Sequence, residues 1–146
     1  MGIPGVGKTT YIKERFKKDV IVLDLYTFQC KYGAFQGYYE LMKELKEKIK
    51  DDNRNGRDIV VEHTILKRKR RKEYVEAIRE VTDEEISLVF IDKTDDEIFN
   101  QLMERYEKMG LIIDEKLKDT TREEIKANRE TLEKPNETKL YKISIE

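Results

Sequence analysis

The beginning of the chain carries the feature that most constrains its fold. Gly2 and Gly7 bracket a short loop, and Lys8, Thr9 and Thr10 follow it directly. Between the two glycines stand Ile3, Pro4, Gly5 and Val6. This spacing is that of the phosphate-binding loop, or P-loop, whose backbone N–H groups surround a triphosphate at the start of a helix. We expect the residues from Gly2 to Thr10 to bind ATP, with GTP as the alternative. Lys8 reaches the outer phosphates in such a loop, and Thr9 binds Mg²⁺.

The P-loop stands close to the start of the sequence. A buried parallel strand of about five or six residues normally precedes such a loop, whereas only Met1 precedes Gly2 here. Met1 is apolar and can be the last residue of that strand. We therefore interpret the first strand as missing or truncated, because a fold without its central strand exposes the edges of two neighbouring strands. The alternative is a chain that binds nucleotide poorly and is inactive as written.

Length and composition set limits on the function. With 146 residues, the chain is expected to form a single domain, 1–146. Its 30 Lys and Arg nearly cancel its 31 Asp and Glu, so the net charge does not indicate a polyanionic partner. The only cysteine, Cys30, excludes an internal disulfide. No apolar run is long enough to span a membrane and no signal peptide is visible, so we expect a cytoplasmic protein without a membrane partner.

Short apolar runs alternate with amphipathic segments along the chain. The runs that predict strands of a parallel sheet are 20–23, 59–61, 86–91 and 140–145. The segments that predict helices are about 8–18, 37–51, 67–81, 95–109 and 121–133. This alternation predicts an α/β fold with helices on both faces of the sheet.

Polar residues follow two of the predicted strands, where an open α/β sheet gathers its ligands. Asp24 ends the first strand, and it either accepts the proton of a substrate hydroxyl, holds magnesium through water, or caps a turn. Glu62 ends the second strand and is a candidate magnesium ligand. Thr64 is a candidate for acceptor binding. His63, the only histidine, is expected to be a structural hydrogen-bonding residue more readily than a catalyst.

Three further features suggest an acceptor site and a lid. Aromatic residues cluster at Tyr26, Phe28, Tyr32, Phe35, Tyr38 and Tyr39, where they either stack on nucleobases or pack in the core. Six consecutive cations occupy 67–72, where they either attract a polyanion or form a solvated face. The segment 95–120 resembles a mobile lid. Its Arg105 either neutralises phosphate charge in the transition state or forms a surface salt bridge.

Taken together, these motifs resemble the predicted-kinase family of P-loop proteins that includes the polynucleotide 5′-hydroxyl kinases, an AAA-type ATP-binding domain. The resemblance rests on 2–10, Asp24, 60–66, Arg70, Arg71, Arg105, 113–114 and 132–135. It implies a nucleotide-kinase-like P-loop NTPase fold, a three-layer sandwich with a parallel sheet and a helical lid. It also implies that Lys8, Asp24 and Arg105 are catalytic.

The chain departs from this family at several positions. Thr27 stands where members commonly have arginine, and Gln101 replaces an earlier lid arginine. Glu62 and Ile65 stand where members often have aspartate and asparagine. These changes affect acceptor specificity more than the catalytic scheme.

The sequence therefore predicts a kinase that transfers the γ-phosphate of ATP to a hydroxyl, with the 5′-hydroxyl of DNA or RNA as the first candidate acceptor. A small-molecule kinase acting on a nucleoside, sugar or metabolite is the alternative. A third hypothesis is a nucleotide-switched ATPase without an acceptor. That class needs an apolar strand ending in Asp-Glu, which the segment 60–63 does not provide.

Overall fold

The computed structural model describes residues 1–16 and 19–146, and within them four short strands form two parallel pairs. β1 (Val20–Asp24) pairs with β2 (Asp58–Glu62), and β3 (Ser87–Phe90) pairs with β4 (Lys142–Ile145). The register of the first pair places Asp24 opposite Glu62.

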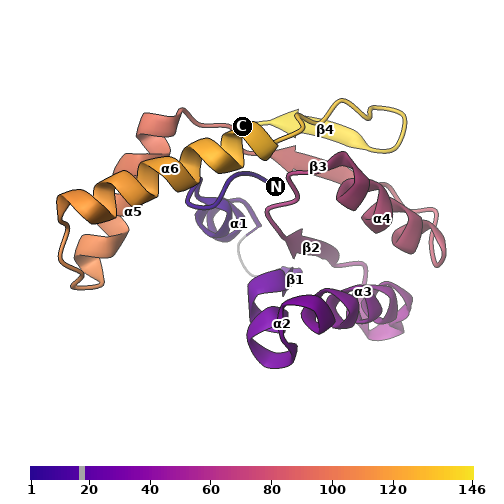
Figure 1. The fold of residues 1–146 in the computed structure, drawn as a ribbon. Helices are drawn as coiled ribbons and strands as arrows, with labels where there is room; N and C mark the ends of the chain where they lie inside the picture. Colours follow the sequence, from indigo (N-terminus) through magenta and orange to yellow (C-terminus); the bar gives the residue numbers. More distant parts are fainter. Residues whose placement is uncertain (17–18) are drawn as a thin grey trace.

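Met1 and Gly2 connect the two strand pairs at their carboxyl ends. The Met1 amine donates to the Val89 carbonyl oxygen, and the Ile91 N–H donates to the Met1 carbonyl oxygen at 3.0 Å. On the other side the Gly2 N–H donates to the Thr64 carbonyl oxygen at 3.2 Å. The start of the chain therefore lies between β2 and β3, which Figure 1 shows on either side of the N-terminus.

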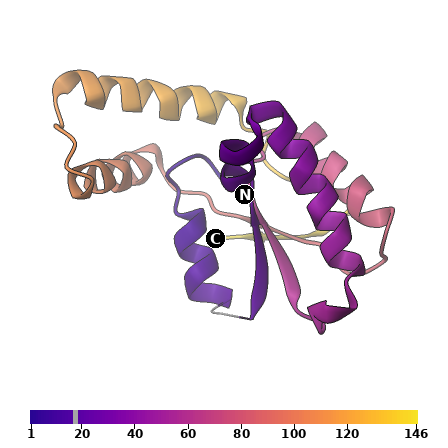
Figure 2. The ribbon, with the colours of Figure 1, turned by 90° about the horizontal axis from the view of Figure 1, so that it is seen from below.

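Helices cover both faces of the strands, as the alternating pattern predicts. They are α1 (Lys8–Phe16), α2 (Leu25–Tyr32), α3 (Ala34–Lys50), α4 (Arg68–Arg79), α5 (Asp95–Lys108) and α6 (Glu115–Thr131), with a short 3₁₀ turn at Asp52–Arg54. α5 and α6 form a hairpin that extends away from the strands (Figures 1 and 2). None of the described helices has the length and hydrophobicity needed to cross a lipid bilayer.

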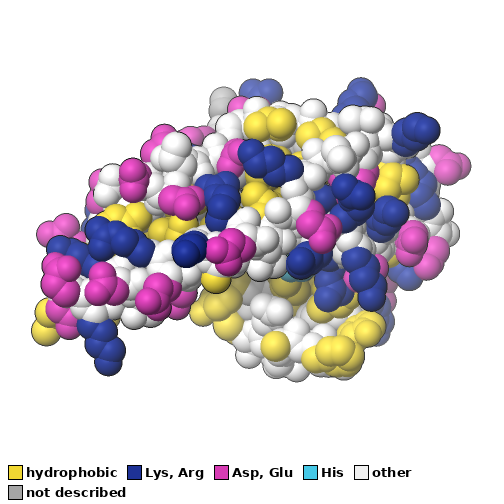
Figure 3. All heavy atoms as spheres, turned by 45° about the horizontal axis from the view of Figure 1, so that its top comes forward, with side chains coloured by type: hydrophobic (Ala, Val, Ile, Leu, Met, Phe, Trp, Pro, Cys, Tyr) yellow, Lys and Arg dark blue, Asp and Glu magenta, His cyan; other side chains and the backbone are white. Residues whose placement is uncertain are grey.

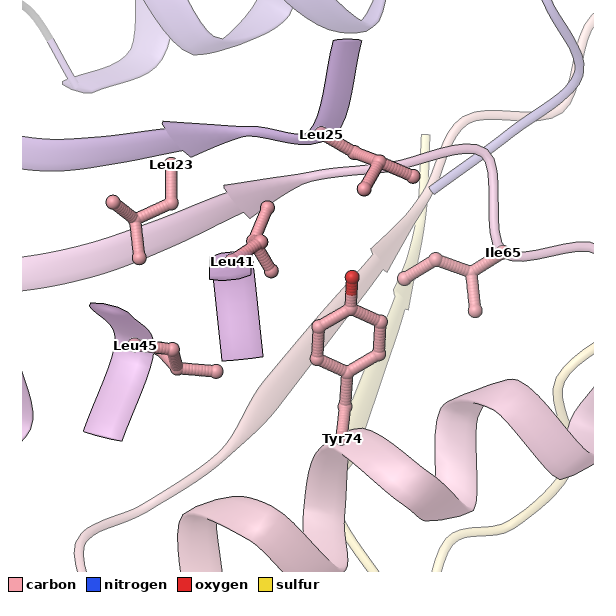
Figure 4. Packing of buried hydrophobic residues seen from close by; sticks show 6 residues of the cluster. All are labelled: Leu23, Leu25, Leu41, Leu45, Ile65 and Tyr74. Atoms are coloured by element: carbon pink, nitrogen blue, oxygen red, sulfur yellow. The ribbon is translucent and has the colours of Figure 1, made fainter. Parts of the chain in front are cut away.

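Two apolar clusters hold these elements together. In the first, Leu23 and Leu25 from β1 and α2 meet Leu41 and Leu45 from α3, with Ile65 and Tyr74 beside them (Figure 4). The second contains Ile3, Val6, Ile91, Ile98 and Ile125. Because Ile3 and Val6 are buried between β3, α5 and α6, the second cluster anchors the P-loop to the base of the hairpin.

The predicted strands are confirmed to within two residues at each end, and the α/β class is confirmed. The helix predictions at 67–81 and 95–109 are also confirmed. The prediction at 8–18 agrees with α1 as far as Phe16, and positions 17–18 lie outside the described residues.

Two helix predictions need correction. The expected helix 37–51 begins at Ala34, and α2 precedes it, separated from it only by Gly33 at φ 90°. The expected helix 121–133 begins six residues earlier, at Glu115, because the Asp114 side chain accepts the Leu117 N–H and caps it. The hairpin therefore continues to Thr131, beyond the expected lid boundary at 120.

Candidate active site

The P-loop has the backbone conformation that its glycines allow. Gly5 and Gly7 have φ values of 86° and 97°, in the left-handed region that favours glycine. A Cβ on Gly5 would lie 2.8 Å from the Leu102 side chain of α5. α5 thus packs directly on the loop, and a side chain at position 5 would push the two apart.

Lys8 lies across this loop at the first turn of α1. Its Nζ donates to the carbonyl oxygens of Gly2 and Ile3 at 3.0 and 3.2 Å. Burial lowers the pKa of Lys8 to about 8; the charge of Arg105 acts in the same direction, and those of Glu62 and Asp24 oppose it. A poorly solvated ammonium held by two carbonyls gains a stronger partner when a phosphate enters the loop.

Thr9 and Glu62 offer two oxygen ligands side by side. The Thr9 hydroxyl donates a hydrogen bond to the Glu62 carboxylate at the end of β2. Within the described residues no group of three or more His, Cys, Asp or Glu side chains is arranged to hold a metal without help. A magnesium ion fits this pair if phosphate oxygens and water complete its coordination, as is usual for Mg²⁺ with nucleotides.

Asp24 is both the last residue of β1 and the N-cap of α2. Its carboxylate accepts the Tyr26 N–H at 3.1 Å and the Thr27 hydroxyl at 2.9 Å. The cap role weighed from the sequence is therefore present, and Thr27, which replaces the arginine of the resembled family, orients the carboxylate. Because Asp24 is in register with Glu62, it lies at the same sheet edge as the P-loop.

His63 and Thr64 lie where the chain leaves β2. His63 Nδ1 lies 2.8 Å from the Tyr74 hydroxyl, and its ring meets the Tyr74 ring edge-on. Burial, helped by the charges of Arg70 and Lys8, lowers the pKa of His63 to about 4, which leaves it neutral at physiological pH. These contacts fit the structural role expected for His63. Thr64 contacts the start of the P-loop through its carbonyl oxygen, so it lies beside the nucleotide loop.

Ile65 has a strained backbone at this edge. Its φ of 46° is in the left-handed region, which is rare for a β-branched residue. Asparagine tolerates this conformation, and it is the residue that the resembled family often has here. Ile65 is instead buried in the first apolar cluster, so packing compensates for the strain.

Lys93 is a second amine beside the P-loop that sequence reasoning missed. With its amide turned to satisfy both partners, Gln101 of α5 donates to the Gly5 carbonyl oxygen at 3.0 Å and accepts from Lys93 Nζ at 2.6 Å. Lys93 Nζ also lies 3.6 Å from where a Cβ on Gly7 would be. Lys93 follows the end of a predicted strand, as Asp24 does. The same criterion that selected Asp24 could therefore have identified Lys93 as a candidate site residue.

Arg105 lies exposed on α5 and forms no ion pair within the described part of the chain. The surface salt bridge that the sequence offered as an alternative is therefore not formed among the described residues. The charge of Arg105 contributes to the lowered pKa of Lys8, which puts the two cations within electrostatic range. Glu97 instead completes a capping box with Thr94 at the start of α5.

The run of cations at 67–72 is largely structural. Arg71 is 2% exposed, and its guanidinium donates to Glu137 at 2.7 Å. Arg68 also donates to Glu137, at 2.9 Å, and Arg70 pairs with Glu73 at 2.7 Å. Lys69 and Lys72 remain exposed. Of the two interpretations weighed from the sequence, salt bridges therefore account for Arg68, Arg70 and Arg71, and Lys69 and Lys72 are left as exposed cations.

The aromatic cluster divides between core and surface. Phe28 and Tyr38 pack against the first apolar cluster. Tyr26, Phe35 and Tyr39 are 73%, 77% and 52% exposed, and together they form what we call the aromatic patch. Figure 3 shows apolar side chains gathered over α2 and α3, with lysine and arginine side chains at their border. The patch begins two residues after Asp24.

Comparisons with known proteins bear on the family and the fold of the chain. No curated protein sequence matches the chain significantly. Its backbone is similar to the crystal structure of a gluconokinase from Sinorhizobium meliloti 1021, with a TM-score of 0.59 and 15% sequence identity over 99% of this chain and 79% of that one. This similarity confirms the nucleotide-kinase-like α/β fold. The family described as "AAA domain" matches residues 1–135. The chain therefore belongs to the AAA domain family, as a member with a P-loop kinase-like fold.

Proposed function

We propose that this protein is an ATP-dependent phosphotransferase that moves the γ-phosphate to a hydroxyl group. The observation that carries the proposal is the meeting of the P-loop with two carboxylates at one sheet edge. Thr9 contacts Glu62 directly, and Glu62 is in register with Asp24. A nucleotide site and a candidate base for an acceptor hydroxyl thus lie at the same edge of the sheet. A protein that only binds nucleotide has no need of such a base.

Each side chain has a role in the proposed reaction. The P-loop amides and Lys8 hold the β- and γ-phosphates, and Thr9 and Glu62 hold magnesium, which neutralises phosphate charge when bound. Asp24 accepts the proton of the acceptor hydroxyl as its oxygen attacks the γ-phosphorus and ADP leaves. Arg105, carried by α5, approaches the phosphates when the hairpin closes. Lys93 lies close enough to the loop to add a further positive charge.

The first candidate acceptor is the 5′-hydroxyl of DNA or RNA. The aromatic patch supports it, because exposed rings near Asp24 suit stacked nucleobases, and Lys69 and Lys72 add positive charge on α4. The second candidate is a nucleoside, sugar or metabolite. The small number of exposed lysines on α4 favours this second candidate, and so does the similarity to a gluconokinase.

A nucleotide-switched ATPase is the remaining alternative. We place the enzyme in the reducing cytoplasm, where ATP is available.

The deciding experiment is phosphoryl transfer from γ-labelled ATP to a panel of 5′-hydroxyl oligonucleotides, nucleosides and small metabolites. We expect label on one acceptor class, and none with Lys8→Ala. Rapid ATP hydrolysis without any acceptor supports the switched ATPase instead. The absence of a thermal shift at millimolar Mg·ATP contradicts every kinase interpretation.

A further inference from the structure

β4 has one edge that carries no partner strand. Among residues 1–16 and 19–146, β4 pairs with β3 and with no other strand. Figure 1 shows it beyond β3, at the outer margin of the molecule. Most of its residues are exposed, and Ile145 is 68% exposed. We call this side of β4 the open edge, and a free strand edge is a template for a further strand.

The backbone groups of β4 alternate between β3 and the open edge. The N–H groups of Lys142 and Glu146 donate to carbonyl oxygens in the segment 86–90 at 3.1 and 2.9 Å. In a parallel pair, every second residue directs both its N–H and its C=O to the neighbouring strand. Ile143 and Ile145 therefore direct theirs to the open edge. These four groups form no backbone hydrogen bond with the part of the chain that the structure describes.

The side chains of this segment are arranged symmetrically about Ser144. Ile143 and Ile145 flank it, and the opposite charges of Lys142 and Glu146 stand one position further out. Alternation along a strand places the three polar side chains on one face and the two isoleucines on the other. The Ser144 hydroxyl donates to the Glu146 carboxylate at 3.0 Å, as expected for side chains on one face. The segment is therefore complementary to a reversed copy of itself.

A second copy of the chain fits the open edge in the antiparallel direction, because the two-fold axis of a closed dimer reverses the strand. When the axis passes beside Ser144, Ile143 of one copy lies opposite Ile145 of the other. These two residues then exchange both of their N–H···O=C bonds. Lys142 lies opposite Glu146 of the second copy, and opposite charges in such cross-strand positions attract.

Other registers that pair the outward backbone groups lose this charge match. A pair centred on Ile143 places Lys142 opposite Ser144. A pair centred on Ile145 places Glu146 opposite Ser144. Charge complementarity therefore selects the register centred on Ser144.

We propose that the open edge of β4 is a homodimer interface, in which β4 pairs antiparallel with β4 of a second copy about Ser144. The two β3–β4 pairs then join into one four-stranded sheet. Each copy contributes one short strand, so the dimer is weak, with a Kd of about 10–100 µM. The proposal is independent of the proposed function.

Charge reversal tests both the partner and the register. Lys142→Glu places two glutamates opposite each other, and Glu146→Lys places two lysines opposite each other, so each variant repels its own copies. A mixture of the two variants restores opposite charges at both positions. We expect sedimentation equilibrium to give a Kd at least about tenfold weaker for each variant alone, and a Kd near that of the wild type for the equimolar mixture. Lys139→Glu, the same charge change at an exposed position before β4, is the control and keeps the wild-type Kd.

A proline tests the backbone pairing. The Ile145 N–H faces the open edge, so Ile145→Pro leaves the hydrogen bonds to β3 in place and removes one donor of each copy from the interface. We expect this variant to be monomeric at about 500 µM, with a thermal midpoint near that of the wild type. If it does not fold, amide exchange of the wild type replaces it, because the Ile143 and Ile145 amides exchange more slowly as the protein concentration rises.

Three results overturn the proposal. They are a wild-type protein that is still monomeric at about 500 µM, charge-reversed variants that dimerise as well as the wild type, and a mixture that associates no more tightly than either variant alone. These measurements contain neither ATP nor an acceptor. A monomeric protein thus leaves the proposed function standing, and a dimer that transfers no phosphate contradicts the proposed function alone.

Discussion

At the residue scale, Asp24 combines two roles that one substitution can separate. Its carboxylate caps α2 by accepting the Tyr26 N–H, and it is the candidate base for the acceptor hydroxyl. Asparagine is as good an N-cap as aspartate but cannot take the proton. We therefore expect Asp24→Asn to lower kcat by about 10²-fold or more while leaving the unfolding midpoint and ATP binding nearly unchanged. Steady-state kinetics measure kcat, thermal unfolding measures the midpoint, and calorimetric titration measures ATP binding. If phosphoryl transfer by Asp24→Asn is unchanged, Asp24 serves only as the N-cap of α2.

Lys93 provides a second prediction at this scale. The Lys93 Nζ lies beside Gly7, and it donates a hydrogen bond to Gln101 when the Gln101 amide is turned. The positive charge of Lys93 is therefore close enough to attract a phosphate bound in the loop. We expect Lys93→Ala to raise the KM for ATP by about tenfold, equivalent to the roughly 1.4 kcal/mol of one lost charge-assisted contact. Lys69→Ala, a substitution of an exposed lysine on α4, is the control and leaves the KM for ATP unchanged. Equal effects of the two variants exclude a specific role for Lys93.

At the element scale, the Arg71–Glu137 pair ties α4 to the segment before β4. Burial alone raises the pKa of Glu137, but hydrogen bonds from Arg71 and Tyr141 outweigh it and hold the pKa at about 2, against 4.5 in the unfolded chain. The ionised Glu137 carboxylate therefore contributes its full stabilisation of the fold above pH 4.5, and this contribution is lost as the pH falls toward 2. We expect Glu137→Gln to cost about 3 kcal/mol at pH 6, measured by urea unfolding. The difference in unfolding free energy between the wild-type protein and Glu137→Gln becomes smaller at pH 3. A difference that stays the same at both pH values contradicts the lowered pKa of Glu137.

Element positions were predictable wherever local patterns decide them. The four apolar runs predicted the four strands of the described residues. β1, β2 and β3 contain nearly continuous apolar runs, as is typical of parallel strands, whereas β4 is mostly exposed and alternates apolar with polar residues. α2 was missed because it buries only Leu25, which leaves no periodic pattern. The sequence also predicted that the P-loop, Glu62 and Asp24 lie at one edge of the sheet, because the carboxyl ends of parallel strands meet there. The Arg71–Glu137 pair and the contact of Lys93 with the loop join distant segments, so only the fold reveals them.

At the scale of the whole molecule, the P-loop is coupled to the α5–α6 hairpin. Leu102 of α5 packs on Gly5, and Ile98 and Ile125 bury the residues beside it. Arg129 of α6 binds Asp92 at 2.8 Å and Asp95 at 2.9 Å, which fixes the base of the hairpin at the end of β3. The hairpin that carries Arg105 is thus held at its base, while Ile112 at its tip is 85% exposed. If the hairpin closes over bound phosphates, as the proposed function requires, the movement takes place about this base.

The aromatic patch lies on α2 and α3, outside the hairpin, and it decides between the two acceptor classes. If a nucleic-acid strand stacks on Tyr26 and Phe35, each stack contributes about 1–3 kcal/mol. We expect Tyr26→Ala and Phe35→Ala each to raise the KM for a 5′-hydroxyl oligonucleotide about tenfold and to leave the KM for ATP unchanged. Ile145→Ala, a change of an exposed side chain on β4, is the control. The KM for the oligonucleotide also rises steeply between about 50 and 200 mM salt. A neutral small acceptor is insensitive to salt and to both aromatic substitutions, so that outcome assigns the enzyme to small-molecule phosphorylation.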